Sequence, residues 1–300
     1  MKKNRVFLSL ARENNDYQQL QASTAEQTAA LLGVELTIAS AKGDSIKQTQ
    51  DLLDVIQASS LRPDAIVVEP AGTTMAHVAK AAVASGIGWV MLNRRPDYMA
   101  ELRARHQVPL FAISSDNEQI GRIQGQQLGV LLPQGGSALY IQGLANATSE
   151  ARLAGLSMTM PKNIELRMLR GNWTQEGGQK AISAWLRLST SKGDRIGVVA
   201  CQNDDMAMGA RRALEQNGQL LGVPFIGVDG VPKAGQTWVR GGALTATIIA
   251  PPHSGLAIEM LVQALQTGVN PREYTLVSPE SHPSLKDLQP KAGKVHSGVK

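Results

Sequence analysis

The chain has 300 residues, which exceeds the usual size of a single hydrophobic core, so two lobes are expected. Its composition, with 43% hydrophobic and 18% charged residues, is that of a globular α/β protein and excludes a disordered or fibrous chain. The net charge of +5 is spread along the chain and no apolar run approaches the roughly 20 residues of a membrane span, so neither nucleic acid nor a membrane interior is an expected partner.

The amino-terminal segment is expected to form the first strand. Basic residues precede the apolar run from Val6 to Ala11, a pattern that faintly imitates a signal peptide. The run is shorter than a signal core, and no small-residue cleavage site follows it. Either a signal has been removed from this chain, or the protein stays in the cytoplasm.

Short apolar runs then alternate with longer stretches of helical periodicity. The expected strands span residues 5–10, 35–39, 65–68, 88–92, 110–113, 138–141, 165–169, 196–200, 224–228, 244–249 and 274–277. The expected helices span residues 16–32, 45–58, 73–85, 117–132, 149–160, 174–188, 204–214, 232–240 and 254–266. This alternation predicts βαβ units, and hence an α/β fold with parallel sheets covered by helices on both faces. No element is expected in the polar stretch 94–107, and a loosely held tail is expected beyond Pro279.

One strand-to-helix junction, around Asn203, is expected to lie at a ligand site. Asn203 follows a buried strand and is placed to cap the next helix, whose first turn carries Asp204 and Asp205. A side chain at this junction points into the crevice beyond the carboxyl ends of the strands, where open α/β sheets bind ligands. Taken alone, the pattern favours a simple helix cap, because caps are far more common than sites.

The motifs at the strand ends, taken together, resemble those of a known family. The stretch 198–214, followed by Phe225–Gly230, resembles the periplasmic sugar-binding proteins of the ribose-binding type. The same fold forms the effector domain of lactose-repressor-like regulators. Further similar motifs lie at residues 14–17, 67–70, 92–95, 113–117, 151–155 and 171–173. The resemblance extends from Val6 to about Val277.

This resemblance implies two doubly wound, Rossmann-like lobes of the periplasmic-binding-protein-like type I, joined by three hinge segments. The expected crossings lie near residues 114–115, 250–252 and 278–279. The expected lobes are residues 1–113 with 251–277, and residues 114–250 with 278–300, the second ending in the loose tail.

The resemblance also implies a ligand site in the cleft between the lobes. It places the ligand contacts at Asn15, Tyr17, Gln18, Glu69, Asn93, Arg94, Arg152, Trp173, Asn203, Asp229 and Ala250. Four of these depart from the ribose pattern: Gln18 replaces an aromatic residue, Glu69 an Asn, Asn93 an Asp and Ala250 a Gln. The scaffold is therefore better supported than ribose as the ligand.

These residue types suit a sugar on chemical grounds alone. Asn, Asp and Glu accept hydrogen bonds from hydroxyl groups, and the guanidinium groups of Arg94 and Arg152 donate to neighbouring oxygens. Tyr17 and Trp173 could cover the C–H faces of the ring. Judged locally, both arginines could instead be solvated, and Asp229 could be a helix cap. A core position for Trp173 is disfavoured by its polar neighbours.

No catalytic constellation is found. The five histidines lack a two-His metal spacing, and the sequence holds no Cys-x-x-Cys pair, phosphate loop, nucleophile elbow or dinucleotide fingerprint. Cys201, the one cysteine, excludes an internal disulfide and is expected to be a packed thiol. Glu69 and Asp229 could act as a carboxylate pair, which is the one route to a glycosidase. We expect no enzyme, no cofactor and no metal site.

The function expected from these observations is that of a solute-binding protein. It would capture a small carbohydrate or polyol and deliver it, as a monomer, to the membrane permease of an ABC-type transporter or to a chemoreceptor. The resemblance places it in the periplasm or cell envelope, with the cytoplasm as the alternative. A second hypothesis is the effector domain of a lactose-repressor-like regulator. It is weaker, because such regulators carry a helix-turn-helix ahead of the domain and the first strand here is expected at residue 5.

Overall fold

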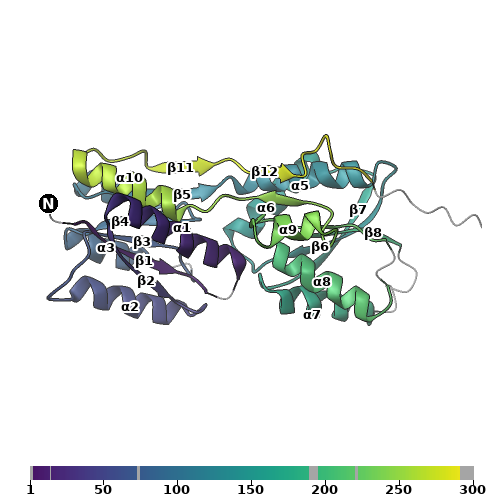
Figure 1. Ribbon diagram of the computed structural model, residues 1–300, viewed down its shortest axis with the longest axis horizontal. Coiled ribbons are helices and arrows are strands. Elements are labelled where there is room, and N and C mark those ends of the chain that lie inside the picture. The colour runs from purple at the N-terminus through teal and green to yellow at the C-terminus, as the bar shows by residue number, and fades with distance from the viewer. Residues whose placement is uncertain (1–2, 14, 73–74, 189–194, 220–221, 291–300) are drawn as a thin grey trace, which may run out of the picture. The chain divides into compact units, whose positions relative to one another are not determined.

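The structure is a computed structural model of the chain, and it describes residues 3–13, 15–72, 75–188, 195–219 and 222–290. The chain divides into two compact units (Figure 1). The first comprises Met1–Ser115 and Pro251–Val277, and the second comprises Asp116–Ala250 and Ser278–Lys300. The backbone therefore passes between the units three times.

The described residues of the first unit form one parallel sheet with helices on both faces. In the order β11-β5-β4-β3-β1-β2, its strands are Tyr274–Val277, Leu110–Ser115, Gly88–Leu92, Ala65–Val68, Arg5–Leu10 and Glu35–Ser40. Its helices are α1 (Asp16–Leu32), α2 (Ser45–Gln57), α3 (Ala76–Ala84), α4 (Met99–Arg105) and α10 (Ser254–Thr267). Because the strands are parallel, the carboxyl ends of β1, β3 and β4 lie at one edge of the sheet.

The core of this unit lies on both sides of the sheet. Val67 and Leu92 pack with residues of α1 and α10 on one side. Ile66 and Trp89 pack with residues of α2, α3 and α4 on the other. Every residue of β3 and β4 is buried, as expected for strands with a continuous apolar sequence.

The second unit contains a four-stranded parallel sheet and a separate two-stranded antiparallel sheet. The parallel strands, in the order β7-β6-β8-β9, are Ile164–Arg170, Gly136–Gln142, Ile196–Cys201 and Phe225–Ile226, and the antiparallel pair is β10 (Thr247–Ile249) with β12 (Glu280–His282). The helices are α5 (Asn117–Leu131), α6 (Ala147–Thr159), α7 (Gln175–Leu186), α8 (Asp204–Gln216) and α9 (Gly235–Arg240).

Two helix pairs cover the parallel sheet of the second unit. Helices α7 and α8 pack on one face through residues such as Ile182 and Leu214, and α5 and α6 pack on the other through residues such as Leu128 and Leu156. Helices α5 and α6 approach closely at Gly155, where a Cβ atom would lie 1.9 Å from the carbonyl oxygen of Glu118. A side chain at position 155 would therefore push the two helices apart.

The expected α/β fold with parallel sheets is confirmed, and three local expectations are corrected. Helix α4 lies in the polar stretch where no element was expected. Its buried residues are only Met99 and Leu102, which are too few to produce a recognisable apolar pattern. The strand expected at 224–228 is only Phe225–Ile226. Helix α3 begins at Ala76 rather than at residue 73, and residues 73–74 lie outside the described part of the chain.

The expected loose tail beyond Pro279 is wrong for the part of it that the structure describes. Strand β12 pairs with β10, with His282 opposite Thr247. Farther on, Leu288 is buried in the core cluster that also contains Leu156. This segment carries little periodicity because tertiary contacts, not local propensity, hold it. Residues 291–300 lie outside the described residues.

Candidate functional site

The candidate ligand residues fall into two groups, one in each unit, and most lie just beyond the carboxyl ends of parallel strands. The first unit carries Asn15, Tyr17, Gln18, Glu69, Asn93 and Arg94, and the second carries Arg152, Trp173, Asn203, Asp229 and Ala250. Within the first unit the residues follow β1, β3 and β4, which are adjacent strands. Asn14, part of the motif after β1, lies outside the described residues.

The residues after β1 form the beginning of α1. Asn15 caps the helix, since its Oδ1 accepts a hydrogen bond of 2.8 Å from the backbone N–H of Gln18. The side chain of Gln18 is buried. The hydroxyl group of Tyr17 donates to the carbonyl oxygen of Pro251 at 3.4 Å. Asn15 therefore has a structural role in addition to the ligand role expected for it.

Glu69 is the principal charged group at this edge. Burial raises the pKa of its carboxyl group. The nearby amides of Gln18, Asn93 and Gln21 and the charge of Arg94 lower this pKa, but burial is the larger effect and the pKa stays above its ordinary value. The Oε2 atom is inaccessible to solvent and has no hydrogen-bond partner among the described residues. These amides therefore favour the charged form, but none reaches Oε2 with hydrogen-bond geometry. An ionised carboxylate accepts hydrogen bonds only, so this atom is suited to a ligand donor.

Asn93 and Arg94 follow β4, and both interact with the carboxylate of Glu69. Asn93 has a φ of +58°, in the left-handed region that few residues other than glycine adopt. Burial lowers the pKa of the Arg94 guanidinium, and the charge of Glu69 raises it. Within the described part of the chain, the Arg94 side chain forms neither a hydrogen bond nor an ion pair with another residue. Its donors are therefore available to ligand oxygens.

In the second unit, the guanidinium group of Arg152 packs against the ring of Trp173. Arg152 is buried, donates from Nε to Oδ1 of Asn117 at 3.0 Å and contacts the carbonyl oxygen of Gln202. Its guanidinium carbon lies 5.6 Å from the centre of the Trp173 ring. Arg152 is thus not a solvated surface residue. Trp173 is only partly buried, at the margin of the core formed by α7 and α8.

Trp173 is further fixed by Gly143 and Asn203. A Cβ atom on Gly143 would lie 2.1 Å from the Cε2 and Cζ2 atoms of the ring, so the indole rests directly against this glycine. Asn203 caps α8 by accepting from the N–H of Met206 at 3.0 Å, and its Nδ2 donates to the Trp173 carbonyl at 3.1 Å. Asn203 is therefore both the helix cap and a support for the aromatic residue.

Asp229 and Ala250 are joined by backbone hydrogen bonds. The N–H of Asp229 donates to Ile248 at 2.9 Å, and its carbonyl oxygen accepts from the N–H of Ala250 at 3.1 Å. The adjacent Gly230 donates its N–H to Oδ2 of Asp204 at 2.9 Å. Ala250 is buried and carries no polar side-chain atom, so it can serve a ligand only through its backbone or its shape.

Backbone strain is concentrated among the candidate residues. Among the described residues, five that are not glycine have positive φ: Lys42, Leu61, Asn93, Trp173 and Asp229. Three of the five, Asn93, Trp173 and Asp229, are residues that the family resemblance placed at the ligand site. Such conformations cost free energy and are found preferentially at functional sites. The strained backbone at these three positions is an observation separate from the family resemblance.

Two buried polar residues that were not expected to take part in the ligand site support it. Asp204 accepts from the Thr247 hydroxyl at 2.7 Å as well as from Gly230, and burial together with the charge of Asp229 raises its pKa. In the first unit, Gln48 contacts the backbone around Glu69. Both lie at helix beginnings, where a polar side chain ordinarily faces water. Only their place in the fold distinguishes them.

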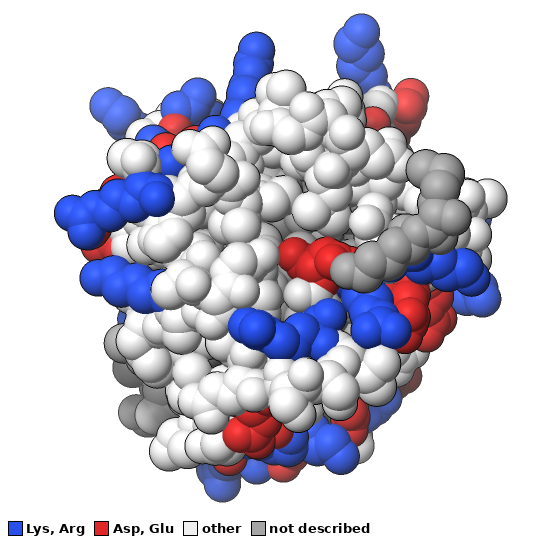
Figure 2. Space-filling view, turned by 90° about the vertical axis from the view of Figure 1, so that its left-hand side faces the viewer, with Lys and Arg blue, Asp and Glu red and all other residues white. Residues whose placement is uncertain are grey.

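The described residues lack two features typical of metalloenzymes and of membrane-spanning proteins. They contain no group of three His, Cys, Asp or Glu side chains arranged to hold a metal ion. No helix among them is sufficiently long and apolar to cross a membrane. Cys201 is buried in β8, and burial raises the pKa of its thiol. On the face shown in Figure 2, basic and acidic side chains are dispersed and do not gather into one basic patch.

Comparison with known proteins shows that the chain is similar to one protein family. A profile described as a periplasmic binding protein domain matches residues 6–268. The D-allose-binding periplasmic protein of Escherichia coli (strain K12) is 26% identical over 249 residues, which are 81% of this chain and 78% of that protein. A protein of Rhizobium meliloti with a provisional name as a rhizopine-binding protein is 30% identical over 202 residues, 65% of this chain and 62% of its own length.

A solved structure agrees with the fold over most of its length. It is an ABC transporter periplasmic solute binding protein from Actinobacillus succinogenes 130z with bound D-allose. Its TM-score is 0.81 at 23% sequence identity, and the match covers 93% of this chain and 97% of that one. At this identity the likeness concerns the fold alone.

Proposed function

The chain belongs to the periplasmic binding protein domain family, a family of solute-binding proteins, and from this premise we propose that it binds a small, uncharged carbohydrate or polyol. It releases the ligand chemically unchanged, to the membrane permease of an ABC-type transporter or to a chemoreceptor. The names of the relatives, among them D-allose-binding and ribose import binding proteins, support both the ligand class and the transport role.

One observation carries the proposed ligand class: at one sheet edge, the Oε2 atom of Glu69 and the guanidinium group of Arg94 both lack a hydrogen-bond partner among the described residues. Glu69 offers an acceptor at Oε2, and Arg94 offers guanidinium donors. A hydroxyl group can donate to the first and accept from the second, whereas a simple anion or cation satisfies only one of them. Their opposite charges also offset each other, so an uncharged ligand needs no counter-ion. Adjacent hydroxyl groups are what a sugar or polyol presents.

Each unit, taken by itself, presents side chains that suit a sugar or polyol. The amide, carboxylate and guanidinium groups can form hydrogen bonds with hydroxyl groups, and the exposed part of Trp173 can cover C–H groups of a sugar. The ligand residues themselves remain a proposal that rests on the family resemblance and on the polar edge and backbone strain described above.

A thermal-shift screen tests this function. A ligand that binds the folded protein raises the melting temperature by mass action, and at 100 times its Kd the stabilisation is about 2.7 kcal/mol. We expect at least one of D-allose, D-ribose, xylitol and myo-inositol to raise the melting temperature, and chromatography to recover it unaltered. Glucosamine and glucuronate provide charged comparisons. A response to glucuronate alone would contradict an uncharged ligand, and turnover would contradict a binding protein.

The family description and the periplasmic relative support a periplasmic location, and we propose a monomeric working form as part of the same function. Sedimentation at micromolar concentration, with and without the stabilising sugar, tests the oligomeric state. A stable dimer in both samples would contradict the monomer.

A further inference from the structure

Gln48 lies where an apolar residue would be expected on α2. It precedes Leu52 and Ile56 by one and two turns on the same helix stripe, and all three are buried. A polar group in such a position costs stability unless its hydrogen bonds are satisfied. The amide of Gln48 is satisfied on both its nitrogen and its oxygen.

The partners of Gln48 all belong to the strand ends that form the candidate site. Its Nε2 donates to the Ser9 hydroxyl and to the carbonyl oxygen of Glu69, both at 2.9 Å. Its Oε1 accepts from the N–H of Ala71 at 2.7 Å. One amide therefore fixes the end of β1 and the backbone that follows Glu69.

The backbone before the Glu69 side chain is fixed by the same neighbour. The N–H of Glu69 donates to the carbonyl oxygen of Ser9 at 2.8 Å. Ser9 and Gln48, which bond to each other, thus hold the peptide groups on both sides of Glu69. The side chain is left to face the amides of Gln18, Gln21 and Asn93, with Arg94 close enough to interact electrostatically.

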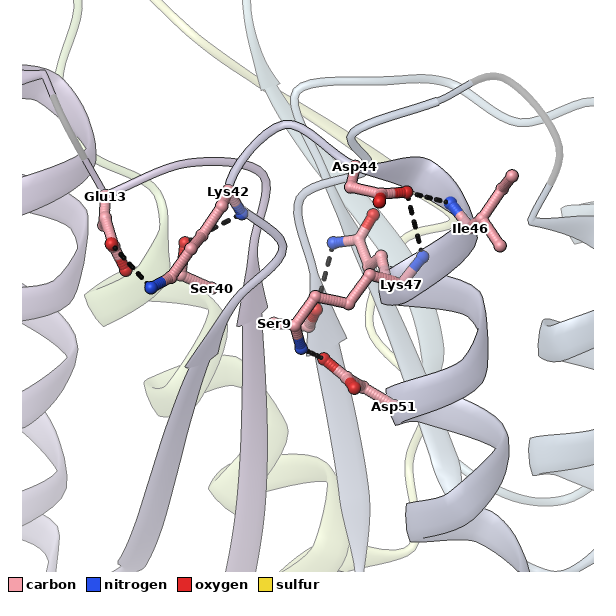
Figure 3. A network of polar contacts seen from close by, with 9 residues as sticks. Ser9, Glu13, Ser40, Lys42, Asp44, Ile46, Lys47 and Asp51 are labelled. Atoms are coloured by element: carbon pink, nitrogen blue, oxygen red, sulfur yellow. Dashed lines mark hydrogen bonds and ion pairs between the residues drawn. The ribbon is translucent and has the colours of Figure 1, made fainter.

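The helix that carries Gln48 is itself anchored at this end, as Figure 3 shows. Asp44 caps it, its Oδ1 accepting from the N–H groups of Ile46 at 2.8 Å and Lys47 at 3.0 Å, and Lys47 pairs with Asp51 one turn later. Gly72 packs against Ser45 so closely that a Cβ atom would lie 2.6 Å from the serine Cβ. The first turn of α2 is therefore a fixed base for the Gln48 side chain.

We propose that Gln48 is a positioning residue of the ligand site, which holds the backbone of Glu69 so that its carboxylate faces the ligand. The effect on affinity rests on the proposed function, whereas the placement of the carboxylate does not. Gln48 itself is buried beneath the backbone and touches no ligand.

The test uses Gln48→Met, which keeps the length of the side chain and removes its hydrogen bonds. Gln50→Met is the matched control, because Gln50 lies on the same helix with an exposed amide bonded only to Asp54 among the described residues. Loss of a buried hydrogen-bond partner should weaken binding of the most stabilising sugar about tenfold in Gln48→Met, and not in Gln50→Met. In a Glu69→Gln background, Gln48→Met should weaken binding by less than about twofold, because the two residues act through one group. Equal losses in both backgrounds would overturn the proposal.

A second measurement needs no ligand. Carboxyl NMR titration of the full chain should show that Gln48→Met lowers the pKa of Glu69 toward its ordinary value, because the released carboxylate gains access to water. An unchanged pKa of Glu69 in a folded Gln48→Met protein would refute the positioning role, even if no tested sugar binds. If that variant does not fold, Gln48→Glu, measured at a pH where the introduced carboxyl group is ionised, keeps the length and the acceptor for Ala71 but cannot donate to the carbonyl oxygen of Glu69. Wild-type affinity in Gln48→Glu would then overturn the proposal.

Discussion

The substitution Glu69→Gln should separate binding from stability. The change keeps the shape of the side chain and removes its charge. A hydrogen bond to a charged group contributes about 1.5–3 kcal/mol, and one between neutral groups about 0.5–1.5 kcal/mol. The ligand donor that meets Oε2 should therefore lose about 1–1.5 kcal/mol, which is roughly a tenfold weaker Kd.

The same substitution should make the unliganded protein more stable. Burial raises the pKa of Glu69 in the folded state above its ordinary value of 4.5, so ionisation favours the unfolded chain. This penalty is absent well below pH 4.5, grows as the pH rises from there to the folded-state pKa, and is constant above it. Glu69→Gln removes the penalty, so its free energy of unfolding should exceed that of the wild type at neutral pH and match it at low pH.

Calorimetric titration and urea unfolding at several pH values measure the two effects. Glu13→Gln is the control, because Glu13 is an exposed acid on the same unit that pairs with Lys42 at 3.3 Å (Figure 3). Its substitution should change either quantity by less than about 0.5 kcal/mol. The account of Glu69 fails if Glu69→Gln binds the sugar as tightly as the wild type, or if the variant is less stable at neutral pH.

Two further substitutions test the aromatic group of the second unit. Trp173→Ala should weaken sugar binding by about 1–3 kcal/mol. The free energy of unfolding should fall by less than the about 3–5 kcal/mol that loss of a core tryptophan costs. A larger loss of stability with unchanged affinity would show that Trp173 is a core residue. Gly143→Ala should weaken binding, because its Cβ atom would displace the Trp173 ring, and it should have little effect in a Trp173→Ala background. Calorimetry of the wild type, the two single variants and the double variant measures both effects. Additive losses of affinity would refute the contact.

The alternation of strands and helices was predictable because buried strands such as β3 and β4 are continuous apolar runs, and helices such as α8 carry an apolar stripe. Helix α4 was not, since Met99 and Leu102 are too few to define a period. Strand β12 was not, because its pairing with β10 depends on residues far apart in the chain. Local pattern fails where a segment owes its structure to tertiary contacts.

The candidate ligand residues came from the resemblance, and their supports came only from the fold. The helical period places Gln48 on the stripe of Leu52 and Ile56, unlike the exposed Gln50 two residues later, but it does not show which groups the Gln48 amide meets. Asp204 and Asp205 are likewise adjacent acids in the first turn of α8, yet only Asp204 is fully buried. Which face of a helix turns inward at its first residues depends on the neighbouring strand ends. A single sequence does not reveal that choice.

The most direct test of the central claim is a calorimetric titration of the full chain with the sugar that stabilises it most. The account predicts one bound sugar per chain and weaker binding in both Glu69→Gln and Trp173→Ala, which alter different units. Absence of binding heat with every sugar and polyol of the screen would contradict the proposed ligand class. A sugar whose affinity depended on only one of the two substitutions would contradict the assignment of the other residue to ligand binding.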